Sequence, residues 1–322
     1  MKEIKVVGVD LGGTNIKAGL VDPGGKIIAR GTTRTKAHEG GEVIADQIAG
    51  LSRKVAADGK ASWKEISGMG IGFPGLIDSN KGVIHTSPNL PRLKDVHLKK
   101  LMEGRLGIPV FVDNDVNVVA LGELTFGAGV GVNNLICMTL GTGIGGGVII
   151  DGRIHRGNGM TAGEIGHIPI NREGPACNCG GKGCLESYTG SERIIGRAID
   201  YIKSGRKTAL TSKVNDLEKL TPKLIAEAAG EGDALSLKVM EETGEYLGIA
   251  LAGVINILDP DIIVIGGGVA EAGQIIFDPI KRTVRDRCYV YLRREIPIVA
   301  SKLGSDAGVL GGAVLALTSL QN

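Results

Sequence analysis

A cluster of cysteine and histidine residues lies between Gly163 and Glu186, where the chain reads GEIGHIPINREGPACNCGGKGCLE. Three of the five cysteines fall in this segment, and one histidine precedes them. A closed structural zinc site takes four such nitrogen or sulfur ligands in a tetrahedral arrangement. The spacing differs from that of a zinc finger, and free buried cysteines or an iron–sulfur cluster are the alternatives. We predict a structural zinc ion bound by His167, Cys177, Cys179 and Cys184.

Two carboxylates, Glu164 and Glu186, bracket this predicted zinc loop. A zinc-bound histidine uses one ring nitrogen for the metal and leaves the other to donate a hydrogen bond outward. Sugar hydroxyls both donate and accept hydrogen bonds, so they require partners of both kinds at fixed angles. A rigid loop that presents the His167 N–H and two carboxylates therefore favours a polyhydroxyl ligand.

A glycine-rich turn follows the first apolar segment of the chain. Residues 4–9 are predicted to form a buried strand, the sequence DLGGTN follows, and residues 16–21 are predicted to form a second strand. A Walker loop or a Rossmann turn would lead into a helix instead. The turn is therefore either a phosphate-binding hairpin with backbone N–H groups at its tip or an ordinary hairpin.

A second copy of this pattern occurs later in the chain. Residues 138–151 read MTLGTGIGGGVIID, which again places a glycine turn between two apolar segments. Chance repetition is the alternative, but the flanking segments match as well as the turns. An internal duplication of a phosphate hairpin predicts two similar lobes that face one nucleotide.

These motifs together resemble the repressor–ORF–kinase (ROK) family of sugar kinases, and within it the bacterial ROK-type glucokinases. The resemblance is carried by LGTGIGGGVIIDGRIHRGNGMTAGEIGHIPI and CNCGGKGCLE, and it extends from DLGGTNIKAGL to GSDAGVLGGA, essentially the whole chain. It implies an α/β fold of the two-lobed actin and hexokinase (ribonuclease H-like) type, with duplicated lobes and a zinc-binding loop. We expect a small lobe from residues 1–113 with about 306–322, and a large lobe from residues 114–305.

Three polar residues, Asp113, Asn114 and Asp115, follow a strand predicted at 108–112 and precede a helix predicted at about 116–126. Any one of them can be read as a helix N-cap. Three in succession exceed what one cap requires. The ROK resemblance implies that Asp115 is the catalytic base and Asn114 a sugar ligand. Phosphoryl transfer has a loose transition state, so an ordinary carboxylate is basic enough for this task.

The resemblance implies further contacts to both substrates. Gly75 lies in a Gly/Pro loop after a strand predicted at 66–72, and Asn89 lies in a second polar loop where it is by default a turn residue. Both are expected to contact the sugar. Mg-ATP is expected to lie on both hairpins and on a third glycine loop after the strand predicted at 261–265. The nucleotide residues are Asp10, Gly12, Gly13, Thr14, Asn15, Lys17, Gly141, Thr142, Gly143, Gly266, Gly267 and Gly268. We expect Asp10 to act through Mg²⁺ and its waters.

The composition is that of a globular α/β protein. The chain has 322 residues, 43% of them hydrophobic and 3% aromatic, and its 52 glycines cluster in the motifs. A net charge of +2 gives no argument for nucleic acid or membrane binding. No apolar segment approaches the roughly 20 residues of a membrane span, and the start reads as a strand rather than a signal peptide. Five cysteines favour a reducing cytoplasm, with Cys137 and Cys288 as inert core thiols.

Apolar periodicity predicts the remaining helices and strands. We expect a strand at 24–30, a solvated connection at 205–218 and a glycine- and alanine-rich helix at the end of the chain. The other helices are predicted at 41–58, 191–204, 221–230, 233–258 and 278–287.

The sequence therefore predicts an ATP-dependent hexose kinase, and by resemblance a glucokinase. A kinase of N-acetylmannosamine, N-acetylglucosamine or fructose is the alternative on the same scaffold. A sugar-responsive transcription regulator is a further alternative, but it would need a DNA-binding module of roughly 60–80 residues before the first strand. The expected partner is a small sugar, without nucleic acid or membrane, and the family resemblance implies a homodimer.

Overall fold

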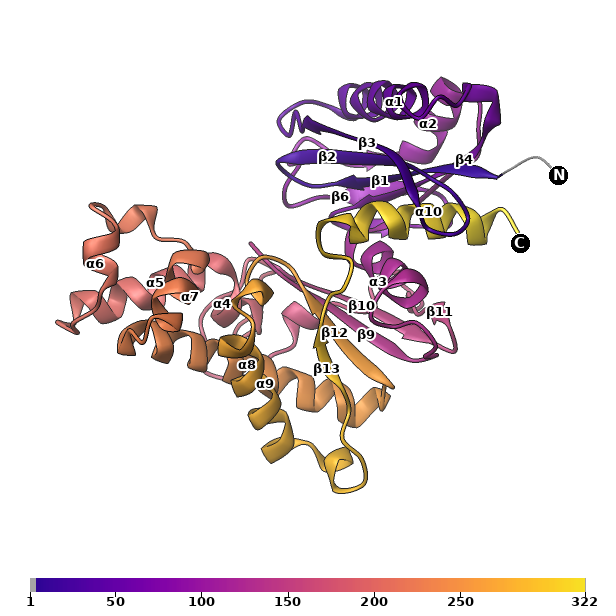
Figure 1. The fold of residues 1–322 in the computed structure, drawn as a ribbon. Helices are drawn as coiled ribbons and strands as arrows, with labels where there is room; N and C mark the ends of the chain where they lie inside the picture. The colour runs from indigo at the N-terminus through magenta and orange to yellow at the C-terminus, as the bar shows by residue number, and fades with distance from the viewer. Residues whose placement is uncertain (1–3, 322) are drawn as a thin grey trace. The chain divides into compact units, whose positions relative to one another are not determined.

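The computed structural model describes residues 4–321 (Figure 1). The chain divides into two compact units. Unit 1 comprises the chain up to Asn133, Gly147–Gly163 and the chain from Lys302 onward, and unit 2 comprises Asn134–Gly146 and Glu164–Ser301. The lobe boundaries that we expected, after residue 113 and near residue 306, assign Asp115 to the large lobe, whereas this division places it in unit 1.

A five-stranded sheet forms the centre of unit 1, with the order β3-β2-β1-β4-β8. Its strands are β1 (Lys5–Leu11), β2 (Asn15–Val21), β3 (Ile27–Arg34), β4 (Ile66–Phe73) and β8 (Val110–Asn114). β2 is antiparallel to β1 and β3, and β4 is parallel to β1 and β8. These are the five strands that the sequence predicts here, although β3 begins later because Asp22 and Gly25 close a turn. A smaller antiparallel sheet contains β5 (Leu76–Asp78), β6 (Val83–Thr86) and β7 (Lys94–Val96).

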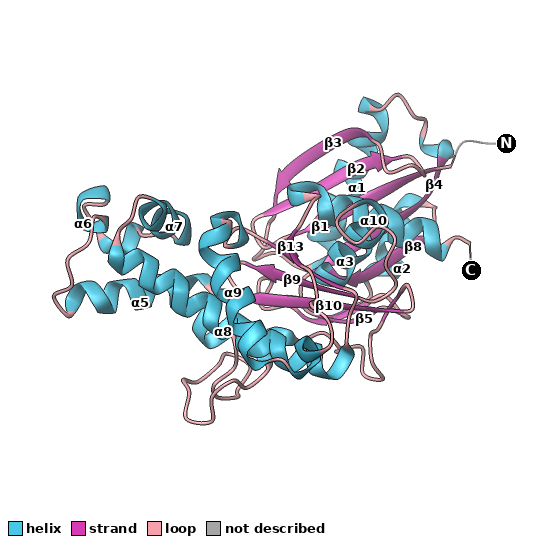
Figure 2. Ribbon diagram, turned by 60° about the horizontal axis from the view of Figure 1, so that its bottom comes forward, coloured by secondary structure: helices cyan, strands magenta, loops and turns pink. Residues whose placement is uncertain are grey.

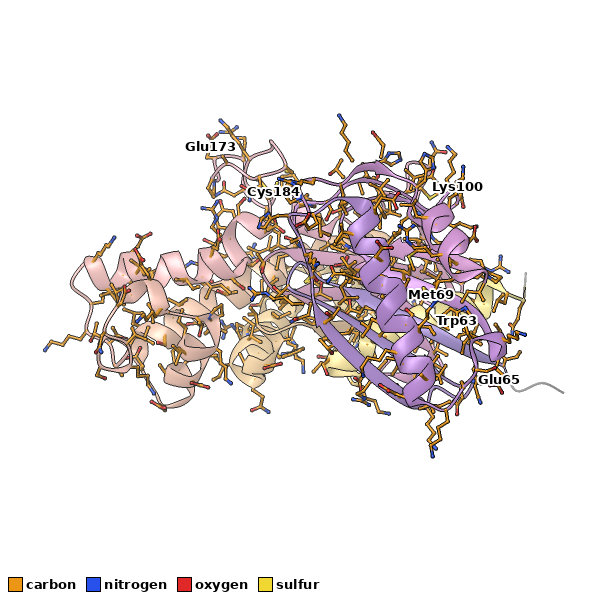
Figure 3. All side chains as sticks on the ribbon, turned by 90° about the horizontal axis from the view of Figure 1, so that it is seen from above. Trp63, Glu65, Met69, Lys100, Glu173 and Cys184 are labelled. Atoms are coloured by element: carbon orange, nitrogen blue, oxygen red, sulfur yellow. The ribbon has the colours of Figure 1, made fainter. Side chains whose placement is uncertain are left out.

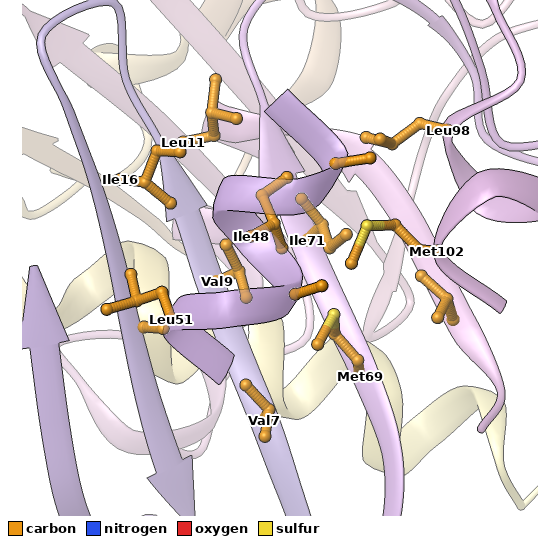
Figure 4. Packing of buried hydrophobic residues seen from close by; sticks show 14 of the residues in the cluster. Val7, Val9, Leu11, Ile16, Ile48, Leu51, Met69, Ile71, Leu98 and Met102 are labelled. Carbon is orange, nitrogen blue, oxygen red and sulfur yellow. The ribbon is translucent and has the colours of Figure 1, made fainter. Parts of the chain in front are cut away.

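Helices cover both faces of the five-stranded sheet. α1 (Gly41–Asp58) and α2 (Leu98–Leu106) pack on one face, and α10 (Ala307–Ser319) packs on the other together with α3 (Asp115–Phe126) (Figure 1). Apolar side chains from α1, α2 and the strands interdigitate between the sheet and the first pair of helices. Figure 4 shows this core, which includes Val7, Val9, Leu11, Ile16, Ile48, Leu51, Met69, Ile71, Leu98 and Met102.

The backbone of α10 lies directly against the backbones of the sheet and of α3, because glycine occupies the contact positions. A Cβ atom added at Gly70 in β4 would lie 2.0 Å from the Gly312 carbonyl oxygen. A Cβ atom added at Gly311 would lie 1.8 Å from the Val118 carbonyl oxygen in α3. Real Cβ atoms do not approach other atoms this closely, so the glycine content of α10 is a packing requirement. The same contact explains why α3, with Asp115 as its first residue, belongs to unit 1.

The second five-stranded sheet has the order β11-β10-β9-β12-β13. Its strands are β9 (Leu135–Leu140), β10 (Ile144–Ile150), β11 (Arg153–Ile154), β12 (Ile262–Gly266) and β13 (Ile298–Ala300). β12 is parallel to β9 and to β13. β9 and β10 form the second strand–turn–strand element that the sequence predicts.

Helices of unit 2 pack around the long helix α8 (Ala234–Leu258), which contacts the other four main helices (Figure 2). These are α4 (Glu186–Thr189), α5 (Ser191–Lys203), α7 (Pro222–Gly230) and α9 (Gln274–Arg287). Two expectations were wrong here. The segment 205–218 contains α6 (Leu210–Lys213), whose Leu210 is fully buried, and α9 begins before the predicted residue 278, with Pro279 inside the helix. Within residues 4–321, no helix combines the length and hydropathy that a membrane span requires.

We predict that Gly311→Ala destabilises the protein although alanine is the better helix former. Overpacking of this kind costs about 1–3 kcal/mol, because the added methyl group meets the Val118 carbonyl. The matched control is Gly50→Ala in α1, where an added Cβ meets nothing within 4 Å. That variant should gain up to about 1 kcal/mol from helix propensity. Thermal and urea unfolding measure both changes, and a Gly311→Ala protein as stable as the wild type would contradict the backbone contact.

Candidate functional site

The predicted site residues fall in both units. Unit 1 holds Asp10, Gly12, Gly13, Thr14, Asn15, Lys17, Gly75, Asn89, Asn114 and Asp115. Unit 2 holds Gly141, Thr142, Gly143, Glu164, His167, Cys177, Cys179, Cys184, Glu186, Gly266, Gly267 and Gly268.

Asp10 lies within β1, opposite Lys17 of β2, because the strand continues through Leu11. The first turn of α10 lies against it, since a Cβ atom added at Gly308 would be 2.5 Å from the Asp10 Cγ. Burial raises the pKa of the Asp10 carboxyl, and the Lys17 ammonium opposes that rise. The Lys17 Nζ donates to the Ser305 carbonyl oxygen at 3.3 Å. Asp10 is therefore a shielded carboxylate that a further cation would stabilise in its charged form.

The first hairpin turn is closed by a hydrogen bond from Gly12 N to Asn15 O of 2.9 Å. Thr35 holds the turn from one side, because its Oγ1 donates to the Gly12 carbonyl oxygen at 2.7 Å and its N–H donates to the Thr14 carbonyl oxygen at 2.8 Å. The exposed Asn89 lies beside the turn, since a Cβ atom added at Gly13 would be 3.0 Å from the Asn89 Cβ. The structure thus brings a predicted sugar ligand next to a predicted phosphate hairpin.

The loop after β4 contains Gly75 at a φ of +127°, a conformation that L side chains rarely adopt. A Cβ atom here would lie 2.2 Å from the Thr86 carbonyl oxygen, so glycine lets this loop contact the segment that carries Asn89. The Asn114 Nδ2 donates to the Gly75 carbonyl oxygen at 3.3 Å. Two of the predicted sugar residues, Gly75 and Asn114, are therefore in contact, and Asn89 follows three residues after Thr86. The buried Ser87 hydroxyl has no hydrogen-bond partner within residues 4–321, and sequence reasoning did not single it out.

Each of the three polar residues between β8 and α3 has a different role. Asn114 is the helix cap, because its Oδ1 accepts from Val116 N at 2.9 Å and from Asn117 N at 3.3 Å. Asp113 is 1% exposed and forms an ion pair with Arg156. Asp115 is the first residue of α3, is partly exposed, and accepts from Val116 N at 3.0 Å through its Oδ1. Asn114 is therefore the cap and Asp113 the buried ion-pair partner, and Asp115 is the partly exposed carboxylate of the three.

The second hairpin turn lies in unit 2 and is held by Glu186. The Glu186 Oε2 accepts a hydrogen bond of 2.8 Å from Ile144 N, directly after the turn. A Cβ atom added at Gly143 would lie 2.5 Å from the same carboxylate oxygen. On the other side, Ser191 donates from both its N–H and its hydroxyl to the Gly141 carbonyl oxygen. Glu186 follows the cysteine loop directly, so one carboxylate connects the turn to that loop.

The four predicted metal ligands converge, with their ligand atoms all within 4.8 Å of one another. The Cys177 Sγ lies 3.6 Å from the His167 Nδ1, and the Cys179 Sγ lies 3.7 Å from the Cys184 Sγ. In a zinc tetrahedron with bonds of about 2.3 Å to sulfur and about 2.05 Å to nitrogen, these two edges measure about 3.6 and about 3.8 Å. The donor set and its geometry therefore fit zinc. Figure 3 shows Cys184 at the base of this loop and Glu173 farther out.

Cys177 and Cys184 differ in how readily their thiols ionise. Burial opposes ionisation of the Cys177 thiol, but hydrogen bonds from the Cys179 backbone and the Ser187 hydroxyl lower its pKa to about 6. Burial and the neighbouring thiols raise the pKa of Cys184 to about 12. A divalent cation offsets this difference, because it stabilises every thiolate that it binds.

The second ring nitrogen of His167 lies near the Glu164 carboxylate. The His167 Nδ1 faces the cysteines, and its Nε2 lies 3.9 Å from the Glu164 Oε2. The two residues flank a single 3₁₀ turn, Ile165–His167, so their spacing is set by the backbone. A pairing of this kind offers a ligand one N–H donor and one carboxylate acceptor side by side.

The third glycine loop borders a cavity of about 190 Å³ in unit 2. Gly267 adopts a φ of +90° and lies against the end of β9, since its added Cβ would be 2.3 Å from the Leu140 carbonyl oxygen. Gly268 and Val269 line the cavity on one side, and residues of α7 line the other. Those α7 residues, Pro222, Lys223, Ala226 and Glu227, were missed by sequence reasoning because nothing in the helix pattern connects them to the glycine loop.

The chain is similar to known proteins over nearly its whole length. The ROK family model matches residues 6–319. The chain is 39% identical over 317 residues to a protein named glucokinase from Thermotoga maritima, with 97% of each chain covered. It is 30% identical to a xylose repressor from Caldicellulosiruptor bescii, covering 98% of this chain and 78% of the repressor.

The solved structures include a ROK family glucokinase from Streptomyces griseus in complex with glucose and AMPPNP. It matches this structure with a TM-score of 0.85 and 34% identity, over 98% of this chain and 99% of that one. The predicted fold class is confirmed by this likeness. The family model and the relatives together cover nearly the whole chain, and the chain belongs to the ROK family.

Proposed function

We propose that the protein is an ATP-dependent glucokinase in which Asp115 is the catalytic base. The observation that carries this proposal is the strand-to-helix junction, where Asn114 caps α3, Asp113 is paired in the interior, and Asp115 remains partly exposed. The 39% identity to a glucokinase over 97% of both chains supports the substrate class.

In this reaction the 6-hydroxyl oxygen of glucose attacks the γ-phosphorus of ATP, the bond to the bridging oxygen breaks, and ADP leaves. The Asp115 carboxylate accepts the proton of the attacking hydroxyl and orients its oxygen. We propose Gly75, Asn89 and Asn114 of unit 1 as ligands of other sugar hydroxyls, and, in their own unit, Glu164, His167 and Glu186 of unit 2. Their mixture of amide, imidazole and carboxylate groups matches the donor and acceptor pattern of a sugar.

The nucleotide would be held mainly by backbone groups. Gly12 N and Gly141 N close the two turns, so Gly13, Thr14, Thr142 and Gly143 would offer their N–H groups to phosphate oxygens. The cavity beside Gly268 would take the adenine and ribose. Asp10 would hold Mg²⁺ through its waters, which fits a shielded carboxylate whose pKa burial raises. The bound ion supplies charge neutralisation along the phosphates.

The zinc ion would be structural, because four protein ligands leave no position for an activated water. Its effect on the reaction would come through His167, which it fixes beside Glu164. Thiolate ligation also requires reduced cysteines, so we place the protein in the cytoplasm. A homodimer stays a prediction from the family.

A substrate panel tests the sugar specificity. We expect ATP-dependent turnover with glucose to exceed that with mannose, fructose and the N-acetyl hexosamines in a coupled assay that measures ADP. Faster turnover of N-acetylmannosamine, N-acetylglucosamine or fructose would replace glucose as the substrate. Sugar binding without turnover of any of them would favour the regulator alternative.

We predict that Asp115→Asn lowers kcat by at least about 100-fold and leaves the KM for glucose within a few-fold, since loss of a general base costs about 10²–10⁴-fold. The control is Asp58→Asn, which removes an exposed carboxylate of unit 1 that pairs with Lys54. Steady-state kinetics of both variants measure the effect. A kcat within threefold of the wild type in Asp115→Asn would remove Asp115 as the base.

We predict about one zinc ion per chain in the purified protein, measured by elemental analysis. Cys184→Ser should lose that zinc, unfold at a lower temperature and raise the KM for glucose, because His167 is no longer held. Cys288→Ser is the matched control, since Cys288 is buried in unit 2 outside the cluster. Fully active protein that contains no zinc would refute the assignment of the metal.

A further inference from the structure

Asp113 is an enclosed carboxylate at which five hydrogen bonds meet. Its Oδ1 accepts from Ser79 Oγ at 3.0 Å, Asn114 N at 2.8 Å and Asn117 Nδ2 at 3.0 Å. Its Oδ2 accepts from Arg156 at 2.8 Å from Nε and at 2.5 Å from Nη2. The carboxylate side chain is 2% exposed, whereas that of Arg156 is 30% exposed. The negative charge is therefore in the interior, and the arginine approaches it from the surface.

Arg156 is itself placed by the backbone that precedes and follows it. β11 pairs with β10, and His155 N donates to the Val148 carbonyl oxygen at 2.8 Å. The Arg156 carbonyl oxygen accepts from Ala162 N at 3.0 Å, which closes a compact loop after β11. The guanidinium thus connects a fixed loop to the junction that bears Asn114 and Asp115, and the same loop continues in sequence to Glu164.

We propose that Arg156 is a positioning residue for the phosphoryl transfer, acting through Asp113 on the orientation of Asn114 and Asp115. Asp113 binds the Asn114 N–H directly and holds the Asn117 side chain in the first turn of α3. Without the guanidinium a buried carboxylate is left uncompensated, which proteins relieve by local rearrangement. A displacement of about 1 Å at a reacting group can cost about 100-fold in rate.

The effect should therefore fall on turnover more than on binding. This inference rests on the proposed function, because it takes Asp115 as the base. It assigns Arg156 no contact with either substrate. A residue that serves folding alone would instead lower stability and the amount of active protein, and it would leave kcat per folded molecule unchanged.

The first test compares Arg156→Ala and Arg156→Lys with Arg153→Ala, which removes an exposed arginine from the same segment. We expect Arg156→Ala to lower kcat by about 30- to 100-fold with the KM for ATP within about twofold. Arg156→Lys should lie between it and the wild type, because an ammonium keeps the charge but not the planar set of donors. Arg153→Ala should match the wild type.

Rescue by free guanidinium chloride at millimolar concentration gives a readout that a folding role would not change. We expect the kcat of Arg156→Ala to recover at least fivefold, with no recovery in Asp115→Asn. A kcat for Arg156→Ala within twofold of the wild type, or a fall that guanidinium and Arg156→Lys both fail to restore, would overturn the proposal.

Hydrogen exchange of the backbone amides of residues 113–119 provides a second test, which does not depend on enzymatic activity. The amides of Asn114 and Asn117 should exchange at least fivefold faster in Arg156→Ala than in the wild type, and unchanged rates would overturn the proposal. If the wild type fails to phosphorylate glucose, the proposed function is wrong. The hydrogen-exchange measurement still decides whether Arg156 orders the junction between β8 and α3. If Arg156→Ala does not fold, the kinetic and hydrogen-exchange measurements are made on Arg156→Lys.

Discussion

The junction between β8 and α3 is the constraint on which the proposed chemistry depends. β8 is a buried strand that runs parallel to β4, so its last residues are fixed by the sheet. The Asp113 carboxylate is held in the interior by two hydrogen bonds from Arg156 and by three others, and Asn114 caps the helix. These two restraints fix the position of Asp115, because the backbone between a hydrogen-bonded strand end and a capped helix has little conformational freedom.

The cysteine loop of unit 2 is restrained in a different way. The loop from 164 to 186 contains little regular structure, and most of its residues between 171 and 182 are exposed, so little apolar burial holds that stretch. A metal ion held by the four clustered residues, as proposed above, would cross-link this loop, and metal binding of this kind contributes directly to folding. Glu186 extends the restraint to the second hairpin turn through Ile144. A single loop therefore connects the imidazole, the carboxylates and the turn that we propose to bind phosphate.

Local patterns in the sequence predicted the local features well. α1 was predicted at its observed bounds because its apolar periodicity is regular, and the clustering of His167 with the three cysteines was predicted because they lie close together in the chain. Features that depend on tertiary contact were missed. Arg156 lies far from Asp113 in sequence, and Lys223 borders the glycine-loop cavity only because α7 folds against it. The lobe boundary that we expected near residue 113 separates α3 from the first sheet. In the structure, glycine contacts pack α3 against α10 and so join it to that sheet, and apolar periodicity in the sequence does not reveal such contacts.

Identification of the reaction product tests the central claim most directly. Wild-type protein incubated with glucose, ATP and Mg²⁺ can be followed by ³¹P NMR with proton correlation to the sugar carbon that bears the phosphate. The proposed chemistry predicts one new phosphomonoester on the 6-oxygen of glucose, formed in step with ADP. Phosphate on another oxygen, or ADP formed together with inorganic phosphate and no sugar phosphate, would contradict the assignment of Asp115 as a base that activates the 6-hydroxyl.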